Sequence, residues 1–146
     1  MKLTLNDIKS KSLRKDSYEK LLKSFNKTSA DDTVVSIQHL LNSNGINYTL
    51  WVIYKCIPDR KMDKRNMCAD LAESVLHIFE EHCWNDTRPR QAIEVCRKEN
   101  ATEKEIDAAM NTAMDATWDA RLAAGYAWNA AAWDTELQNI ILKYFG

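Results

Sequence analysis

The chain has 146 residues, 45% of them hydrophobic and 28% charged, which is the composition of an ordinary globular protein. It contains only three Gly and two Pro, too few for the many tight turns of an all-β fold. No apolar run approaches the roughly 20 residues that a membrane span requires. These limits predict one all-α domain over residues 1–146.

Charge is divided unevenly along the chain, although the formal net charge is only −1. Residues 1–65 hold 13 Lys and Arg against 7 Asp and Glu, and residues 66–146 hold 7 against 14. The net charges are therefore +6 and −7. Either the two halves pack together and partly neutralise each other, or one of them is a docking surface for a charged partner. The first residues carry charges and no apolar signal core, so we expect a cytoplasmic protein.

Three helix starts are predicted in the first 45 residues. Capping signals occur at Thr4, at Asp16 and at Thr33, and Gly45 is a typical helix stop. The apolar residues that these helices would bury are Tyr18, Leu21, Leu22, Phe25, Val34, Ile37, Leu40 and Leu41.

Residues 48–57 have the β-branched and aromatic composition of a strand. However, Asn47 could cap a helix here, Pro58 could end it, and no second strand is available for pairing. We therefore predict a buried helix, with a strand as the alternative.

A helix hairpin is predicted at the centre of the chain. Leu71, Val75, Leu76 and Phe79 form one apolar stripe, and a helix with this stripe ends near residue 83. A polar corner follows at 84–87. The second helix begins around 88–90, where Pro is tolerated in the first turn, and it buries Ala92, Ile93 and Cys96.

The hairpin carries a resemblance to a known family. The run FEEHCWNDTRPRQAIE at 79–94 resembles the signature of the immunity protein family, helical proteins of bacteria and phages in which an aspartate-rich corner precedes Arg-Pro-Arg-x-Ala-Ile-Glu. Trp84 and Asn85 stand where Pro-Asp is more usual. The resemblance covers about residues 68–132. It implies a helical fold and an interaction role, and it supplies no catalytic residue and no cofactor.

The two arginines at the start of the second helix need an explanation, because the helix dipole disfavours cations there. Asp86, Glu94 or Glu80 and Glu81 could compensate the charges of Arg88 and Arg90 and lock the corner. Alternatively, Asp86, Arg88 and Arg90 form a site for an anion or for a partner's carboxylate.

An Ala-rich helical region follows a capping box at Thr102, with eleven Ala among residues 108–132. Trp118, Leu122 and Trp133 point away from its main stripe. Either the helix breaks near Gly125, or both faces are covered, or the Trp face is a partner surface. A last amphipathic helix would be capped at Asp134 and Thr135. The main stripe is Ile106, Met110, Ala113, Thr117, Ala124, Trp128 and Ala131, and the last helix carries Leu137, Ile140, Ile141 and Tyr144.

No catalytic, metal or cofactor site is predicted. Glu73, His77 and Glu81 share a helix face, but H-E-x-x-H is absent and a solvated, salt-bridged face explains the stripe better. The four cysteines are widely spaced, and we expect reduced, buried side chains instead of disulfides or metal ligands. They are Cys56, Cys68, Cys83 and Cys96.

Together these features predict a non-enzymatic helical inhibitor that binds a toxin or a defence-system protein, including phage inhibitors of the anti-CRISPR type. The acidic half would bind a basic protein partner. The alternatives are a nucleic-acid-binding regulator that uses the basic N-terminal helices and a metal-dependent enzyme. The predicted partner-binding residues are Asp115, Trp118, Asp119, Trp133 and Asp134.

Overall fold

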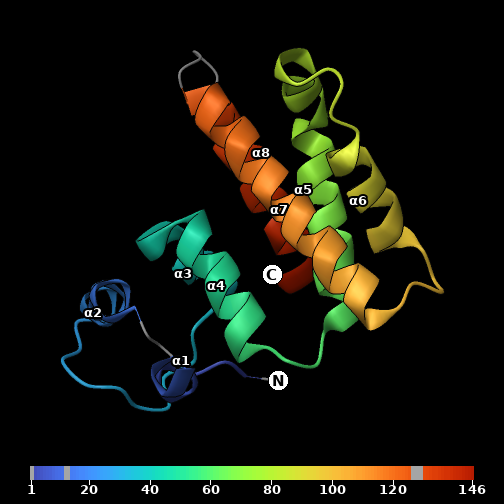
Figure 1. Ribbon diagram of the computed structural model, residues 1–146. Coiled ribbons are helices and arrows are strands. Elements are labelled where there is room, and N and C mark those ends of the chain that lie inside the picture. Colours follow the sequence, from blue (N-terminus) through green and yellow to red (C-terminus); the bar gives the residue numbers. More distant parts are fainter. Residues whose placement is uncertain (1, 12–13, 126–129) are drawn as a thin grey trace. The chain divides into compact units, whose positions relative to one another are not determined.

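A computed structural model describes residues 2–11, 14–125 and 130–146 (Figure 1). Its described residues form eight α-helices and no strand, which confirms the all-α prediction. The helices are α1 (Leu5–Lys11), α2 (Lys15–Ser24), α3 (Ile37–Asn44), α4 (Ile46–Cys56), α5 (Lys61–His82), α6 (Arg88–Arg97), α7 (Glu103–Gly125) and α8 (Ala130–Phe145). None of the described helices has the length and apolar character needed to cross a membrane.

The chain divides into two compact units. Unit 1 comprises Met1–Arg60 with Phe145–Gly146, and unit 2 comprises Lys61–Tyr144. The boundary falls in the charged segment between α4 and α5. That residues 1–146 act as one domain stays a prediction.

Unit 1 is built on α1 to α4, in which α3 packs on both α2 and α4 and α1 packs on α4. Polar groups tie its helices together. The Tyr18 hydroxyl donates to the Leu5 carbonyl at 3.0 Å, and the Asn44 side-chain amide donates to the Ser17 carbonyl at 2.7 Å. The apolar side chains at its centre include Leu5, Ile8, Leu21, Leu40, Val52 and Ile53.

The predicted helices of unit 1 are present, but two of their three predicted N-cap residues are wrong. Asp16 lies inside the first turn of α2, which begins at Lys15. Thr33 does not cap α3, because its carbonyl accepts from the Leu5 amide and holds this segment extended along the N-terminal residues. Ser36 is the cap instead, and its hydroxyl accepts from the His39 amide at 3.1 Å. Val34, expected in the core, is 51% exposed as a result.

Residues 48–56 are helical, as predicted, and only residue 57 lies outside α4. One side of α4 is buried. The cap differs from the prediction. Gly45, with φ of 80°, ends α3 and also precedes the first residue of α4, so Asn47 lies within the helix. A positive φ favours glycine, which explains why the chain turns at this residue.

Unit 2 is organised around α5, α6 and α7, which all pack on one another. Small side chains fill the space between them, so the helix axes can approach closely. The buried cluster consists of Ala69, Ala72, Ala92, Ile93, Cys96, Ala109 and Ala113. Of the predicted stripe of α7, Ala113 and Thr117 are buried, Met110 is half-buried and packs against this cluster, and Ile106 is half-buried.

The ends of α7 and α8 test three further predictions. The capping box at Thr102 is present, since its amide donates to Glu105 at 2.8 Å and its hydroxyl accepts from the Glu105 amide at 3.3 Å. Helix α7 ends at Gly125 and α8 begins at Ala130, close to the break predicted near Gly125. Trp128 lies outside the described residues. Asp134 and Thr135 do not cap α8, because the Ala run starts that helix earlier.

No disulfide links the four cysteines, all of which the structure describes, and three of them are buried as predicted. Cys56, Cys68 and Cys96 lie inside helices, whereas Cys83 is exposed at the corner just after α5. Burial raises the pKa of the Cys96 thiol, which lowers its reactivity further.

We predict that Ala113→Leu destabilises the protein by about 1–3 kcal/mol, because a larger side chain must push α5, α6 and α7 apart. The measurement is urea unfolding followed by circular dichroism. Ala108→Leu is the matched control, since Ala108 is exposed on the same helix and should change stability by less than about 0.5 kcal/mol. Equal effects of the two substitutions would contradict the close packing.

Thiol titration gives a second expectation. In the native protein one thiol, Cys83, should react quickly with a disulfide reagent, and the three buried thiols should react only as the fold opens. Four thiols should be found after denaturation without reductant. Fewer than four would indicate a disulfide.

Candidate interaction surface

A single carboxylate of α5 joins three helices of unit 2. Asp70 accepts from Arg97 of α6 at 3.0 Å and from both Lys143 and Tyr144 of α8 at 2.7 Å. Arg97 also donates to Glu73, one turn further along α5, at 2.6 and 3.0 Å. The Asp70 side chain is only 21% exposed. This network fixes the helices that position the surface described below.

Two opposing effects act on the pKa of Asp70. Burial raises it, but the hydrogen bonds from Lys143, Tyr144 and Arg97 outweigh burial, so the pKa lies below its ordinary value. The carboxylate is therefore held in its charged form, in which it can accept from all three donors.

The hairpin corner contains two ion pairs. The Arg88 guanidinium donates to both Asp86 oxygens, with an Nη2–Oδ2 distance of 2.5 Å, and lowers the pKa of Asp86 to about 2. Arg90 donates to Glu80 of α5, with an Nη2–Oε1 distance of 2.6 Å. Of the acids that the sequence offered as candidates, Asp86 therefore compensates the charge of Arg88, and Glu80 compensates the charge of Arg90. Because Arg88 and Arg90 are both exposed, each pair contributes little to stability.

Arg65 is a structural residue that the sequence did not reveal. It lies on α5 and is only 7% exposed. Its guanidinium donates to the carbonyls of Cys96 at 3.1 Å and Lys98 at 2.6 Å. These carbonyls are at the C-terminal end of α6, where no further turn supplies an amide donor and where the helix dipole favours a cation.

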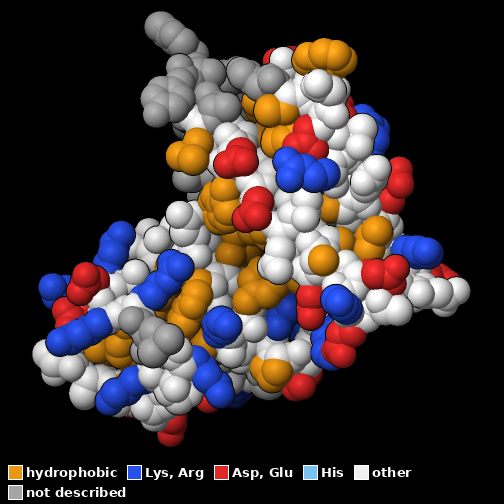
Figure 2. Space-filling model, in the orientation of Figure 1, with side chains coloured by type: hydrophobic (Ala, Val, Ile, Leu, Met, Phe, Trp, Pro, Cys, Tyr) orange, Lys and Arg blue, Asp and Glu red, His pale blue; other side chains and the backbone are white. Residues whose placement is uncertain are grey.

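The outer side of α7 is acidic. Glu103, Asp107, Asp115 and Asp119 are all exposed, and Asp115 and Asp119, four residues apart, share one face of the helix. Figure 2 shows acidic side chains along the visible face of α7. Glu103 pairs with Lys61 at 2.6 Å. Among the side chains that the structure describes, no Lys or Arg forms an ion pair with Asp115 or Asp119.

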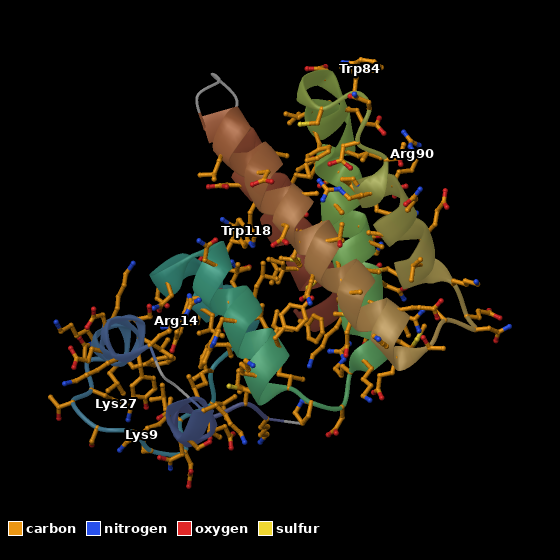
Figure 3. All side chains as sticks on the ribbon, viewed as in Figure 1. Lys9, Arg14, Lys27, Trp84, Arg90 and Trp118 are labelled. Atoms are coloured by element: carbon orange, nitrogen blue, oxygen red, sulfur yellow. The ribbon has the colours of Figure 1, made fainter. Side chains whose placement is uncertain are left out.

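The remaining predicted partner-binding residues have mixed positions. Trp118 is half-buried on α7 (Figure 3). Asp134 is half-buried on α8. Trp133 lies in α8, but its side chain is outside the described residues. The described part of the set thus comprises the exposed carboxylates of Asp115 and Asp119, the partly covered indole of Trp118 and the half-buried Asp134.

Trp84 is the residue that sequence reasoning missed. Its side chain is 81% exposed at the hairpin corner (Figure 3). The signal was present, because a Trp stands in a polar turn where nothing apolar is needed to build the hairpin. Leu122 of α7 is 64% exposed.

Metal binding has no support in the described part of the chain. There, no group of three His, Cys, Asp or Glu side chains is arranged to hold an ion. Glu73, one member of the stripe considered above, is paired with Arg97, which lowers the pKa of Glu73.

Residues 59–134, more than half of the chain, match the model of a family described as Imm-5-like putative immunity protein. The chain belongs to this family. The matched residues include α5, α6 and α7 with the hairpin corner. No curated protein and no solved structure matches the chain. Membership in the family supports an immunity-type role and, with it, a protein partner; it also favours a non-enzymatic function.

The Asp70 network predicts a pH dependence of stability. Because the native pKa of Asp70 is depressed, its stabilisation is present above the ordinary Asp pKa of about 3.9 and is lost as the pH falls through the native value. Asp70→Asn should cost about 1–3 kcal/mol at pH 7. The difference in melting temperature between wild type and variant should shrink as the pH falls from 5 to 3.

The control for this experiment is Glu94→Gln, which changes an exposed carboxylate of α6. It should melt like the wild type at each pH. A constant difference between the wild type and Asp70→Asn over the whole pH range would contradict the proposed role of the Asp70 charge.

Proposed function

We propose that this protein is a non-enzymatic, immunity-type inhibitor that binds a basic protein partner through the acidic outer side of α7. The partner would be a toxin or a nuclease of a defence system, and a phage inhibitor of the anti-CRISPR type belongs to the same class. One observation carries the proposal: Asp115 and Asp119 are exposed one turn apart, and no described side chain neutralises them.

Other acidic residues of unit 2 support this interpretation by contrast. Six of these acids have a structural partner, whereas no described side chain forms an ion pair or hydrogen bond with Asp115 or Asp119. The six acids are Asp70, Glu73, Glu80, Asp86, Glu103 and Glu105. Charges that the fold does not use are available for a partner.

The physical mechanism would be electrostatic steering followed by occupation of the partner's active surface. Unit 2 holds ten Lys and Arg against fifteen Asp and Glu, a net charge of −5. A negative surface accelerates the encounter with a basic protein and orients it. Nucleases present basic grooves to the phosphates of their substrates, so an inhibitor seated there would block substrate entry without any chemistry of its own.

The alternative function is nucleic-acid binding by unit 1. Its observation is a set of exposed lysines on α1 and α2, and Figure 2 shows Lys and Arg side chains spread over this unit. The set comprises Lys9, Lys11, Lys15, Lys20 and Lys23. Such a surface would contact phosphates without reading bases.

Charge reversal tests the proposal. The partner is first captured from cells that naturally make the chain, identified by mass spectrometry and purified. Asp115→Lys with Asp119→Lys should then weaken its binding at least tenfold in 50 mM salt and less in 500 mM salt, because salt screens exposed charges. Isothermal titration calorimetry measures the Kd, and the melting temperature should be unchanged.

Two control variants accompany this double substitution. Glu94→Lys with Glu99→Lys reverses two exposed charges around the end of α6 and should leave the Kd within about twofold. Lys20→Glu with Lys23→Glu tests the alternative, together with a titration of a 20-base-pair DNA duplex. Equal Kd values for the wild type and the α7 variant would overturn the proposal; DNA binding that is lost only in the α2 variant would favour the alternative.

A further inference from the structure

Trp84 is the most exposed of the large apolar side chains that the structure describes. It is 81% exposed, compared with 64% for Leu122, 54% for Met62 and 51% for Val34. Trp is the side chain that gains most from being buried, and a monomer gains nothing from leaving it in water. A polar residue would serve the turn equally well, so the indole is available to a partner at no cost to the fold.

The backbone around Trp84 is held on both sides. The Cys83 amide donates to the Phe79 carbonyl at 2.8 Å, and the Asp86 amide donates to the Cys83 carbonyl at 3.0 Å. The Arg88 amide then donates to the Asp86 carboxylate at 3.0 Å. An indole on a fixed turn loses little conformational entropy when it is buried against a partner, which is the property of an anchor residue.

The charges close to Trp84 also limit what can cover it. Within the corner, Glu80 and Asp86 are neutralised by Arg90 and Arg88, while Glu81 is exposed.

The α5–α6 and α6–α7 turns reverse the chain twice, so α5 and α7 end at the same end of unit 2 (Figure 1). Trp84 follows the end of α5.

The end of α7 adds to this surface. Leu122 lies one turn before the end of α7, and Asp119 precedes it by three residues. Leu122 and Asp119 therefore lie towards the same end of unit 2 as Trp84, and Asp115 is one turn further from that end. An apolar anchor beside a charged rim is the composition of an interface hot spot.

We propose that Trp84 is the anchor of the partner interface and inserts into an apolar pocket of the partner protein that is bordered by Lys and Arg. Charge complementarity with Asp115, Asp119 and Glu81 selects this occupant. An anionic membrane would be repelled by the same carboxylates, and a second copy of unit 2 would carry the same negative charge. The inference rests on the proposed function and deepens it, because it assigns the residue that holds the partner in place.

Photo-crosslinking tests the anchor directly. A benzophenone amino acid replaces Trp84 in the full chain, and the matched control carries it at Met62, another exposed apolar residue near the opposite end of α5. After irradiation in cells that naturally make the chain, the position-84 protein should give an adduct with the basic partner captured by the wild type. The Met62 position should give none, and Asp115→Lys with Asp119→Lys should reduce the adduct at least tenfold.

Affinity measurements with that purified partner give an independent readout. Trp84→Ala should raise the Kd roughly 30-fold or more, as for a hot-spot residue, with an unchanged melting temperature. Trp84→Phe should recover part of the affinity, and Met62→Ala should stay within about twofold. Because Trp84 is exposed, none of these variants should lose the fold.

Several results would overturn the inference. If Trp84→Ala bound the partner as tightly as the wild type does, Trp84 would not be the anchor, but the proposed function would stand. An adduct of twice the chain's mass would identify a second copy as the occupant. A blue-shifted Trp emission with phosphatidylglycerol vesicles, lost in Trp84→Ala, would identify a membrane. If the wild type retained no partner at all, the proposed function and the anchor would both be wrong.

Discussion

The arrangement of unit 2 depends on the hydrogen bonds that the Asp70 carboxylate accepts from α6 and α8. The core between α5, α6 and α7 is made mainly of Ala, and each buried methyl group contributes only about 1 kcal/mol of hydrophobic stabilisation. Small residues permit close helix packing but do little to fix how the helices are turned. Arg97 supplies that information for α6 on α5, and Lys143 supplies it for α8 on α5, because charge-assisted hydrogen bonds require defined directions.

The sequence predicted features that are encoded within a few residues. The Gly45 stop, the Thr102 capping box and the polar corner after α5 all depend on neighbours in the chain. The capping signals at Thr33 and Asp134 had the same local form and were wrong. Backbone hydrogen bonds to the N-terminal residues hold Thr33 extended, and the Ala run had already started the helix before Asp134.

Long-range polar partners could not be predicted. Arg65 and Arg97 each contact groups more than twenty residues away, and no local pattern distinguishes them from solvated cations. Asp115 and Asp119 were predicted from the excess of acidic residues after residue 65, so this part of the candidate surface was accessible from the sequence. Trp84 was missed although it stands in a polar turn, because a turn has no periodicity from which the exposure of a side chain is inferred.

The contact of Arg65 with the end of α6 has a consequence for how unit 2 opens. With ten residues, α6 is too short to be stable alone in water, and its last carbonyls depend on a guanidinium from α5. Any fluctuation that withdraws Arg65 therefore frays α6 as well. Amide protons of the two helices should exchange with solvent as one cooperative segment, although they are separated by an exposed corner.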